Sequence, residues 1–203
     1  MNKFFAYAVA GLVLFGVVVA GFVISDAMFG SNSKNRSGTI VGAPQIGGEF
    51  TLTNNKGQVV TEKDFKGKLM LVFFGYTFCP DVCPTEMNVF VNVVQGLGDA
   101  AKEIVPVFIT VDPKRDTVEV MDEFVQAFDP SIVGLTGTEA QINGVKKAFR
   151  AYGQTVNEKD DPEFYLVDHT SFTYLMDKDG TLSTVFSYGT SPEEIIEKIK
   201  DVL

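Results

Sequence analysis

The stretch that decides the fold is LMLVFFGYTFCPDVCP, residues 69–84. It begins with an uninterrupted apolar run from Leu69 to Gly75, which is typical of a strand buried on both faces of a sheet. A loop carrying two cysteines, Cys79 and Cys83, follows directly. In residues 85–97 the apolar side chains then recur at spacings of three and four, which predicts a helix. The stretch therefore indicates a buried strand, a loop with reactive side chains and a helix.

Strands and helices alternate on both sides of this stretch. The patterns predict a hairpin formed by residues 50–53 and 58–61, strands at 104–111 and 132–135, a late hairpin formed by 171–176 and 184–188, and helices that begin at Asp116, Thr138 and Ser191. Each of these three helix starts is followed three residues later by Glu or Gln, the pattern of a capping box. The order predicts an α/β fold of the thioredoxin-like type, with a central mixed sheet, flanking helices and an N-terminal hairpin. Such sheets place their sites at the carboxyl ends of strands, where Cys79 and Cys83 fall.

A metal site is the function that the rarest residues favour. The 203 residues contain two cysteines and one histidine, His169, which follows Asp168 and precedes a second apolar run. Two thiolates and an imidazole form a soft ligand set that suits copper, and thiolate favours Cu(I) in particular. A disulfide between Cys79 and Cys83 would close a very small loop and stabilise little. The start of a helix beside Cys83 favours thiolate, so ligand or redox roles are the better interpretation.

The N-terminal region predicts a membrane anchor. Residues 4–24 are uncharged and mostly apolar, which is enough to span a bilayer as one helix. A cleaved signal peptide is the alternative, but the apolar run is long for one and the cleavage signal is weak. Residues 26–43 are rich in Ser, Gly and Asn, as in a flexible linker. We therefore expect an anchor at 1–25, a linker at 26–43 and one folded domain at 44–203.

The charge of the chain narrows the classes of partner. The formal net charge is −9, and the acidic residues lie almost entirely outside the apolar N-terminal segment. Nucleic acid is excluded as a ligand because its phosphates require clustered Lys and Arg. The charge permits steering toward a basic partner, or it serves only to keep the domain soluble.

With these residues identified, the chain resembles the Sco family of membrane-anchored copper metallochaperones. The resemblance runs from the anchor to the last helix. It rests on three segments: GYTFCPDVCP at 75–84, VDPKRDT at 111–117 and DHTS at 168–171. The combination of Cys-x-x-x-Cys with a later Asp-His is far more specific than either part alone.

The resemblance implies a thioredoxin-like domain that binds copper, as Cu(I) or Cu(II), through Cys79, Cys83 and His169. The family role is delivery of copper to, or reduction of cysteines in, the binuclear copper site of cytochrome c oxidase subunit II. A copper donor or a thiol reductant protein is the expected second partner. The resemblance also implies that the domain faces the periplasm or, in mitochondria, the intermembrane space. The short N-terminal tail and the absence of a transit-peptide composition favour a single-pass protein of the bacterial inner membrane with its domain in the periplasm. The cysteine pair, Cys79 and Cys83, is then redox-active as well as metal-binding.

Three rival functions remain open at this point. Residues 82–86, VCPTE, look like the peroxidatic segment of peroxiredoxins, although those enzymes do not pair that cysteine with one four positions earlier. A general thiol–disulfide oxidoreductase usually carries Cys-x-x-Cys and a proline before a later strand. Here the spacing is one residue longer, and no proline lies between Pro162 and Pro192. Structural zinc requires four protein ligands, and the sequence offers three good ones.

Four residues near these motifs have two interpretations each. Asp168 either orients the imidazole of His169 or is a solvated turn residue. Asp112 and Arg115 either order the loop facing the cysteines or belong to a simple β-turn. Met87 lies on the apolar face of its helix, so core packing is favoured over a thioether ligand.

Overall fold

A computed structural model of the chain describes residues 45–157, 161 and 164–203. The strands are β1 (Thr51–Asn54), β2 (Val59–Thr61), β3 (Leu69–Gly75), β4 (Ile104–Thr110), β5 (Val133–Thr136), β6 (Gly153–Val156), β7 (Leu166–His169), β8 (Thr173–Met176) and β9 (Leu182–Phe186). The helices are α2 (Val82–Leu97), α3 (Val118–Phe128), α4 (Glu139–Phe149) and α5 (Pro192–Lys200), with short 3-10 helices η1 (Glu62–Phe65) and η2 (Gly98–Glu103). The anchor and linker expected at 1–25 and 26–43 lie outside the described residues. Within the described part, no helix is long and apolar enough to cross a membrane.

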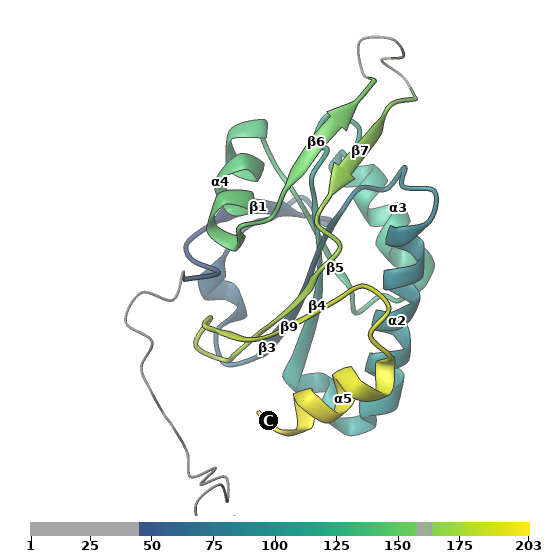
Figure 1. Ribbon diagram of the computed structural model, residues 1–203. Helices are drawn as coiled ribbons and strands as arrows, with labels where there is room; N and C mark the ends of the chain where they lie inside the picture. The colour runs from purple at the N-terminus through teal and green to yellow at the C-terminus, as the bar shows by residue number, and fades with distance from the viewer. Residues whose placement is uncertain (1–44, 158–160, 162–163) are drawn as a thin grey trace, which may run out of the picture. The chain divides into compact units, whose positions relative to one another are not determined.

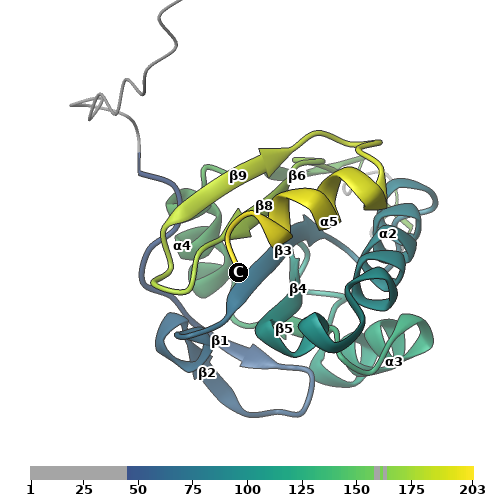
Figure 2. The same cartoon turned by 90° about the horizontal axis from the view of Figure 1, so that it is seen from below.

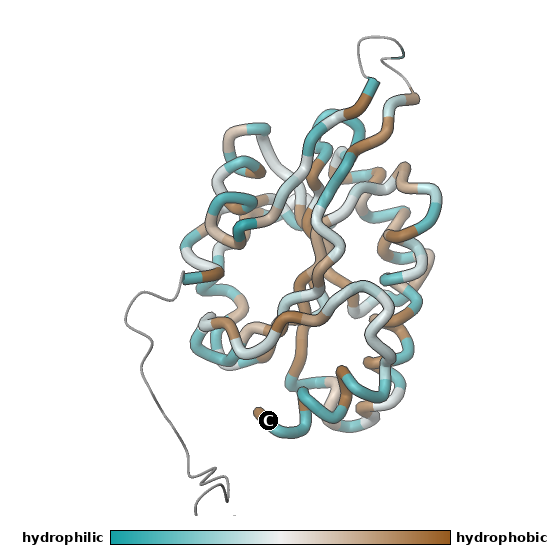
Figure 3. The backbone as a smooth tube through the Cα atoms, in the orientation of Figure 1, coloured by the Kyte–Doolittle hydropathy of each residue, from teal (hydrophilic) through white to brown (hydrophobic). Residues whose placement is uncertain are grey.

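Seven strands form the central sheet in the order β2-β1-β5-β4-β3-β8-β9. The pairs β3–β4 and β4–β5 are parallel, and the other pairs are antiparallel. The sheet is therefore mixed, as the sequence predicts, with β3 in its interior between β4 and β8. All seven residues of β3 are buried, which explains its uninterrupted apolar run. Figure 3 shows hydrophobic residues gathered along the central strands.

Helices cover both faces of this sheet, with α4 on one face and α2 and α3 on the other (Figures 1 and 2). Neighbouring residues of β3 point to opposite faces, as the pleat requires. Phe74 packs against Phe149 of α4, with ring centroids 5.4 Å apart. On the other face Phe108 of β4 packs against Phe124 of α3, at 5.0 Å. Phe74, Phe108 and Phe149 are buried. Burying a Phe side chain contributes roughly 1.5–3 kcal/mol, so these three rings contribute substantially to the stability of the fold.

The predicted capping boxes are confirmed in full at one helix start and in half at a second, and the third is wrong. Thr138 and Gln141 form a complete capping box at α4, and the Ser191 hydroxyl accepts the Glu194 N–H at α5. The prediction that Asp116 caps α3 is wrong, because the N-cap is Thr117. Asp116 is instead fully buried and bonds to other side chains. A buried acceptor and a capping acceptor look alike in a sequence, since both are Asp before a helix.

A second, two-stranded sheet formed by β6 and β7 was not predicted from the sequence. The strands pair in antiparallel register, with Gly153 opposite His169. Figure 1 shows them side by side and set apart from the seven-stranded sheet. The late hairpin, by contrast, is confirmed as β8 and β9. The two-stranded sheet matters for function because its last residue is the single histidine of the chain.

Candidate metal centre

Cys83 lies in the first turn of α2 with its side chain completely buried. Its sulfur packs against the carboxyl end of β3. A Cβ added to Gly75 would lie 2.6 Å from the Cys83 Sγ and 2.8 Å from a ring carbon of Phe108. No real side chain tolerates such distances, so glycine is needed at position 75 to make room for the sulfur. The strand and the cysteine are thus fitted to each other.

Cys79 is half-buried in the turn between β3 and α2. Its backbone N–H donates to the Tyr76 carbonyl at 3.2 Å, which closes the turn. Its sulfur accepts the backbone N–H of Cys83 at 3.5 Å, close to the start of α2. Neither Cys79 nor Cys83 forms a disulfide. The turn therefore presents one partly accessible sulfur above one buried sulfur.

His169 reaches the same place from the end of β7. Its Nε2 lies 3.6 Å from the Cys83 Sγ, and its Nδ1 lies 2.9 Å from the Thr170 carbonyl oxygen. A carbonyl can only accept, so Nδ1 carries a proton and donates, which leaves the Nε2 lone pair of the neutral ring toward the sulfur. The rings of Phe73 and Tyr76 meet the imidazole edge-to-face, at 5.9 and 5.7 Å between centroids. These contacts fix the ring plane.

Asp168 is exposed on β7, where it pairs in register with Gln154. The hydrogen bond that orients the imidazole is donated by its Nδ1–H to the Thr170 carbonyl. Of the two interpretations given for Asp168, the structure therefore favours the solvated residue.

The three ligand atoms lie within 4.8 Å of one another. They come from the turn after β3, from α2 and from β7, so the site forms only when these three segments meet. Two sulfurs and one imidazole nitrogen at this spacing suit a soft metal ion. The structure brings together all three residues singled out in the sequence.

Hydrogen bonding between the sulfurs separates their acidities. The Cys83 side chain stabilises the Cys79 thiolate by hydrogen bonding and, with help from His169, lowers the pKa of Cys79 to about 3 despite partial burial. The same hydrogen bond, burial and the Cys79 charge raise the pKa of Cys83 far above its usual range. Without metal the pair is therefore one thiolate and one thiol.

The pKa of His169 is shifted in the direction opposite to the effect of burial alone. Burial lowers the pKa of His169, but hydrogen bonds with Cys79 and the Thr170 carbonyl outweigh it and leave the pKa raised. A metal cation bound here therefore competes with protons on Cys83 and His169.

Arg115 ties the cysteine turn to the histidine strand. Its Nε donates to Asp112 at 2.6 Å, and its Nη1 donates to the Tyr165 carbonyl at 2.8 Å. The guanidinium carbon lies over the rings of Tyr165, Phe78 and Tyr76, at 3.6, 4.9 and 5.6 Å from their centroids. The Tyr165 hydroxyl donates to Asp112 at 2.8 Å and completes the group. The interpretation that Asp112 and Arg115 order the loop facing the cysteines is confirmed.

Met87 is completely buried in the hydrophobic core on α2, so the core-packing interpretation is confirmed.

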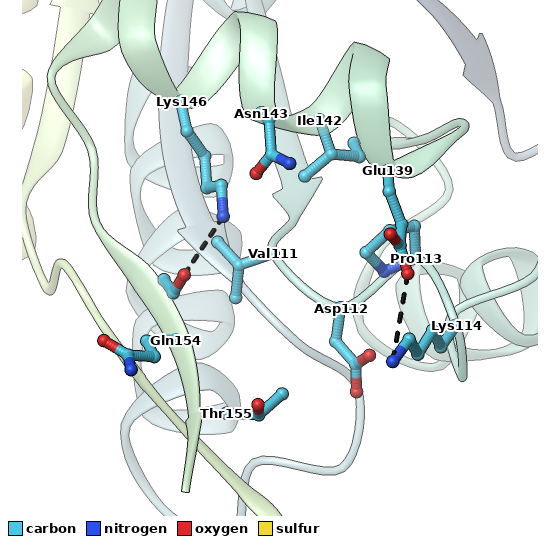
Figure 4. A pocket seen from close by; sticks show the side chains of 11 residues that line it. Val111, Asp112, Pro113, Lys114, Glu139, Ile142, Asn143, Lys146, Gln154 and Thr155 are labelled. Atoms are coloured by element: carbon cyan, nitrogen blue, oxygen red, sulfur yellow. Dashed lines mark hydrogen bonds and ion pairs between the residues drawn. The ribbon is translucent and has the colours of Figure 1, made fainter.

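A cavity of about 250 Å³ lies between the loop after β4, helix α4 and strand β6. Figure 4 shows its lining, with Lys146 donating to the Gly153 carbonyl and Lys114 paired with Glu139. Asp112 also lines it, but Cys79, Cys83 and His169 are not among the residues around it. The soft ligands and this polar cavity are therefore separate features of the fold.

Comparison with known proteins identifies the family. The profile of the SCO1/SenC family matches residues 39–203. An SCO2-like protein of Rickettsia felis is 44% identical over 156 residues, which cover 77% of this chain and 76% of the relative. The mitochondrial SCO1 homolog of Homo sapiens is 39% identical over 161 residues, covering 78% of this chain and 53% of the relative.

Solved structures agree with this result. The structure of Bradyrhizobium japonicum ScoI with copper bound is 43% identical, with a TM-score of 0.72, and the match covers 78% of this chain and 99% of that chain. Yeast Sco1 with copper bound is 35% identical, also with a TM-score of 0.72, and the match covers 78% and 88% of the two chains. A family profile that spans most of the chain, together with relatives above 40% identity, shows that this protein belongs to the SCO1/SenC family.

Proposed function

We propose that this protein is a copper metallochaperone that holds one copper ion through Cys79, Cys83 and His169 and passes it to another protein. The observation that carries the proposal is the convergence of two sulfurs and one imidazole nitrogen within 4.8 Å. The copper-bound structures of two family members support it.

The residues divide the work of binding. Cys79 is the more exposed sulfur and, with its pKa of about 3, is already a thiolate at neutral pH, so it makes the first contact with incoming copper. Cys83 then loses its proton to become the second sulfur ligand, and His169 supplies Nε2. Three such ligands suffice for Cu(I), whereas Cu(II) adds a further oxygen ligand.

The acceptor that we propose is the binuclear copper site of cytochrome c oxidase subunit II. The support is the family membership and the role that the resemblance implies. We also propose that residues 1–25 anchor the chain in a bacterial inner membrane, that 26–43 are a linker, and that the domain at 44–203 faces the periplasm.

Reduction of the acceptor's cysteines is a second candidate, favoured by the unequal exposure of the two sulfurs. The Cys79 thiolate would attack the acceptor's disulfide, form a mixed disulfide and release one acceptor thiolate. Cys83, losing its proton to that thiolate, would then attack Cys79 Sγ. The acceptor leaves with both cysteines reduced, and this chain keeps a Cys79–Cys83 disulfide.

Copper stoichiometry on the purified full-length chain tests the proposal. The reduced protein should bind one copper per chain, and its Cu(II) form should show thiolate charge-transfer absorption. Oxidation to the disulfide, followed as a two-proton mass loss, should abolish uptake, and reduction should restore it. Full copper binding by the disulfide form would contradict the ligand assignment. A peroxide turnover assay distinguishes the copper metallochaperone from the alternative of a peroxiredoxin-like thiol peroxidase, which would turn over peroxide.

A further inference from the structure

Asp116 is a completely buried carboxylate close to the cysteine turn but outside the set of metal ligands. It accepts the Thr77 N–H at 3.1 Å and the Thr77 hydroxyl at 2.6 Å. The Thr110 hydroxyl of β4 donates to Oδ2, the same oxygen that accepts the Thr77 N–H. Burying a carboxylate is unfavourable unless hydrogen bonds compensate, and here they concentrate on one residue of the turn.

Thr77 is the second residue of the turn that carries Cys79. It follows Tyr76, whose carbonyl accepts the Cys79 N–H. Holding Thr77 in place therefore also holds the turn that follows β3, and with it the position of the Cys79 sulfur. The hydrogen bonds from Thr77 to Asp116 hold the turn in this orientation, and they do not involve the sulfur atoms.

Asp116 is itself held firmly by the sheet. Its backbone N–H donates to the Asp112 carbonyl at 3.0 Å. Its own carbonyl accepts the Thr136 hydroxyl of β5 at 2.7 Å. The Thr136 bond holds only the backbone of Asp116, whereas the carboxylate is bonded by Thr110 of β4. The carboxylate therefore transmits the position of β4 to the cysteine turn.

We propose that Asp116 is a positioning residue for the metal site, which holds the Thr77 turn so that the Cys79 sulfur stays within bonding reach of Cys83 and His169. This inference rests on the proposed copper function and deepens it. Loss of the carboxylate leaves every ligand in place but frees the Cys79 sulfur to move. Copper affinity should fall, and the disulfide should form less readily, because both require the two sulfurs at a fixed separation.

Five variants of the full-length chain test this proposal. Asp116→Ala removes the carboxylate that accepts the Thr77 hydrogen bonds, and Asp116→Asn keeps one acceptor oxygen. Thr77→Val removes the hydroxyl on the turn, and Thr77→Ser restores it. Thr136→Val is the matched control, because it also removes a buried hydroxyl that bonds to Asp116 but does not touch the turn.

Three measurements are made on each variant: Cu(I) affinity by competition with a chelator, the Cu(II)–thiolate absorption band, and stability by urea unfolding. We expect about a tenfold or larger loss of Cu(I) affinity and a shifted band for Asp116→Ala, by analogy with other supporting residues around metal sites. Thr77→Val should show a smaller change in the same direction, and Asp116→Asn and Thr77→Ser should recover much of the parent behaviour. Thr136→Val should lower stability with affinity and band unchanged.

Unchanged affinity and absorption in Thr77→Val and a folded Asp116→Ala would overturn the proposal. So would equal changes in Thr136→Val, since the effect would then follow stability alone. If Asp116→Ala does not fold, Thr77→Val against Thr136→Val decides the question.

A copper-independent measurement separates this proposal from the proposed function. Equilibration with glutathione reports how readily Cys79 and Cys83 form their disulfide, with glutathione disulfide as the oxidant and two glutathione thiols as products. If the parent binds no copper, the copper function fails. A shift toward the dithiol in Thr77→Val, absent in Thr136→Val, would still support the positioning role, and no shift would contradict it.

Discussion

The cysteines and the histidine belong to regions that are built differently. The cysteine region, β3 and α2, lies in the interior of the molecule, with β3 paired on both sides by β4 and β8. The histidine region is the two-stranded sheet of β6 and β7, whose strands pair only with each other within the described part of the chain. A lone pair of strands is marginally stable by itself, so the histidine region depends on side-chain contacts such as those of Arg115 with Tyr165.

This difference suggests how a site can hold copper and still release it. Segments with few paired neighbours open locally at lower free energy than core strands. We therefore expect the sulfur ligands to define whether copper binds, and the histidine ligand to define which oxidation state is held and how readily copper leaves. The predictions below test this division.

The largest effect is expected from the cysteine region. Cys83→Ala and Cys79→Ala should each abolish stoichiometric copper binding, because a single sulfur and one imidazole make a poor site. Copper per chain after gel filtration measures this. Met87→Leu, a volume-conserving change on the same helix, should keep full binding and cost less than about 1.5 kcal/mol. Parent-like affinity in either cysteine variant would show that the ligands are assigned wrongly.

His169→Ala should have a smaller and more selective effect. Two thiolates can still hold Cu(I) linearly, so Cu(I) affinity should fall modestly, whereas Cu(II), which prefers nitrogen and oxygen donors, should bind much more weakly. Competition titrations in both oxidation states measure the two affinities. Equal losses would contradict the proposed division between the regions.

The same variant is informative in cells. A deletion strain carrying His169→Ala should have low cytochrome c oxidase activity at limiting copper and partial recovery with added copper. Asp168→Asn is the matched control, since that exposed neighbour does not orient the ring. Full oxidase activity from the His169→Ala gene at low copper would show that the histidine is dispensable.

Gly75→Ala should damage the cysteine region without removing a ligand. The added Cβ would meet the Cys83 sulfur and Phe108, and such overpacking typically costs about 1–3 kcal/mol of stability. The free energy of unfolding measured with urea and the copper affinity should both be lower than in the parent. Gly144→Ala is the control, because Gly144 lies inside α4 and an added Cβ would meet no atom within 4 Å apart from its chain neighbours and the backbone of its own helix. This variant should be more stable by up to ~1 kcal/mol. A neutral Gly75→Ala would mean that the sulfur has room to move.

The smallest expected effect is a pH dependence in the cysteine region. Glu86 on α2 is buried and accepts the Thr173 hydroxyl of β8 at 2.9 Å, and burial raises its pKa above 4.5. Its protonated form is favoured in the folded state, so its contribution to stability is present below about pH 4.5 and is lost as pH rises through the folded pKa. Glu86→Gln should therefore become more stable relative to the parent as pH rises through this window.

Urea unfolding at several pH values measures that difference. Glu119→Gln should show the opposite trend. Hydrogen bonding to its own backbone N–H and to Thr117 lowers the pKa of Glu119, so its stabilisation is present at neutral pH and lost on acidification. A Glu86→Gln difference that is flat with pH would contradict the assignment of a raised pKa.

The sequence by itself predicted the class of the fold and the candidate ligand set. The apolar run at 69–75 predicted a strand buried on both faces, and its alternation with amphipathic helices predicted a mixed sheet covered on both sides, as the structure has it. Two cysteines and one histidine in the whole chain left few ways to build a soft metal site. These features are visible in a sequence because each depends on local periodicity or on residue type.

Tertiary structure alone decided how the ligands are held. Strands β6 (GQTV) and β7 (LVDH) show neither an apolar run nor a clear alternation of apolar and polar residues, and they exist because the two segments pair with each other. Asp116 looked like a helix cap, since the sequence does not reveal that Thr77, thirty-nine positions away, donates to it. The orientation of His169 comes from a backbone carbonyl and two aromatic rings rather than from Asp168. Contacts between distant segments carry no local signal, so only the folded chain shows them.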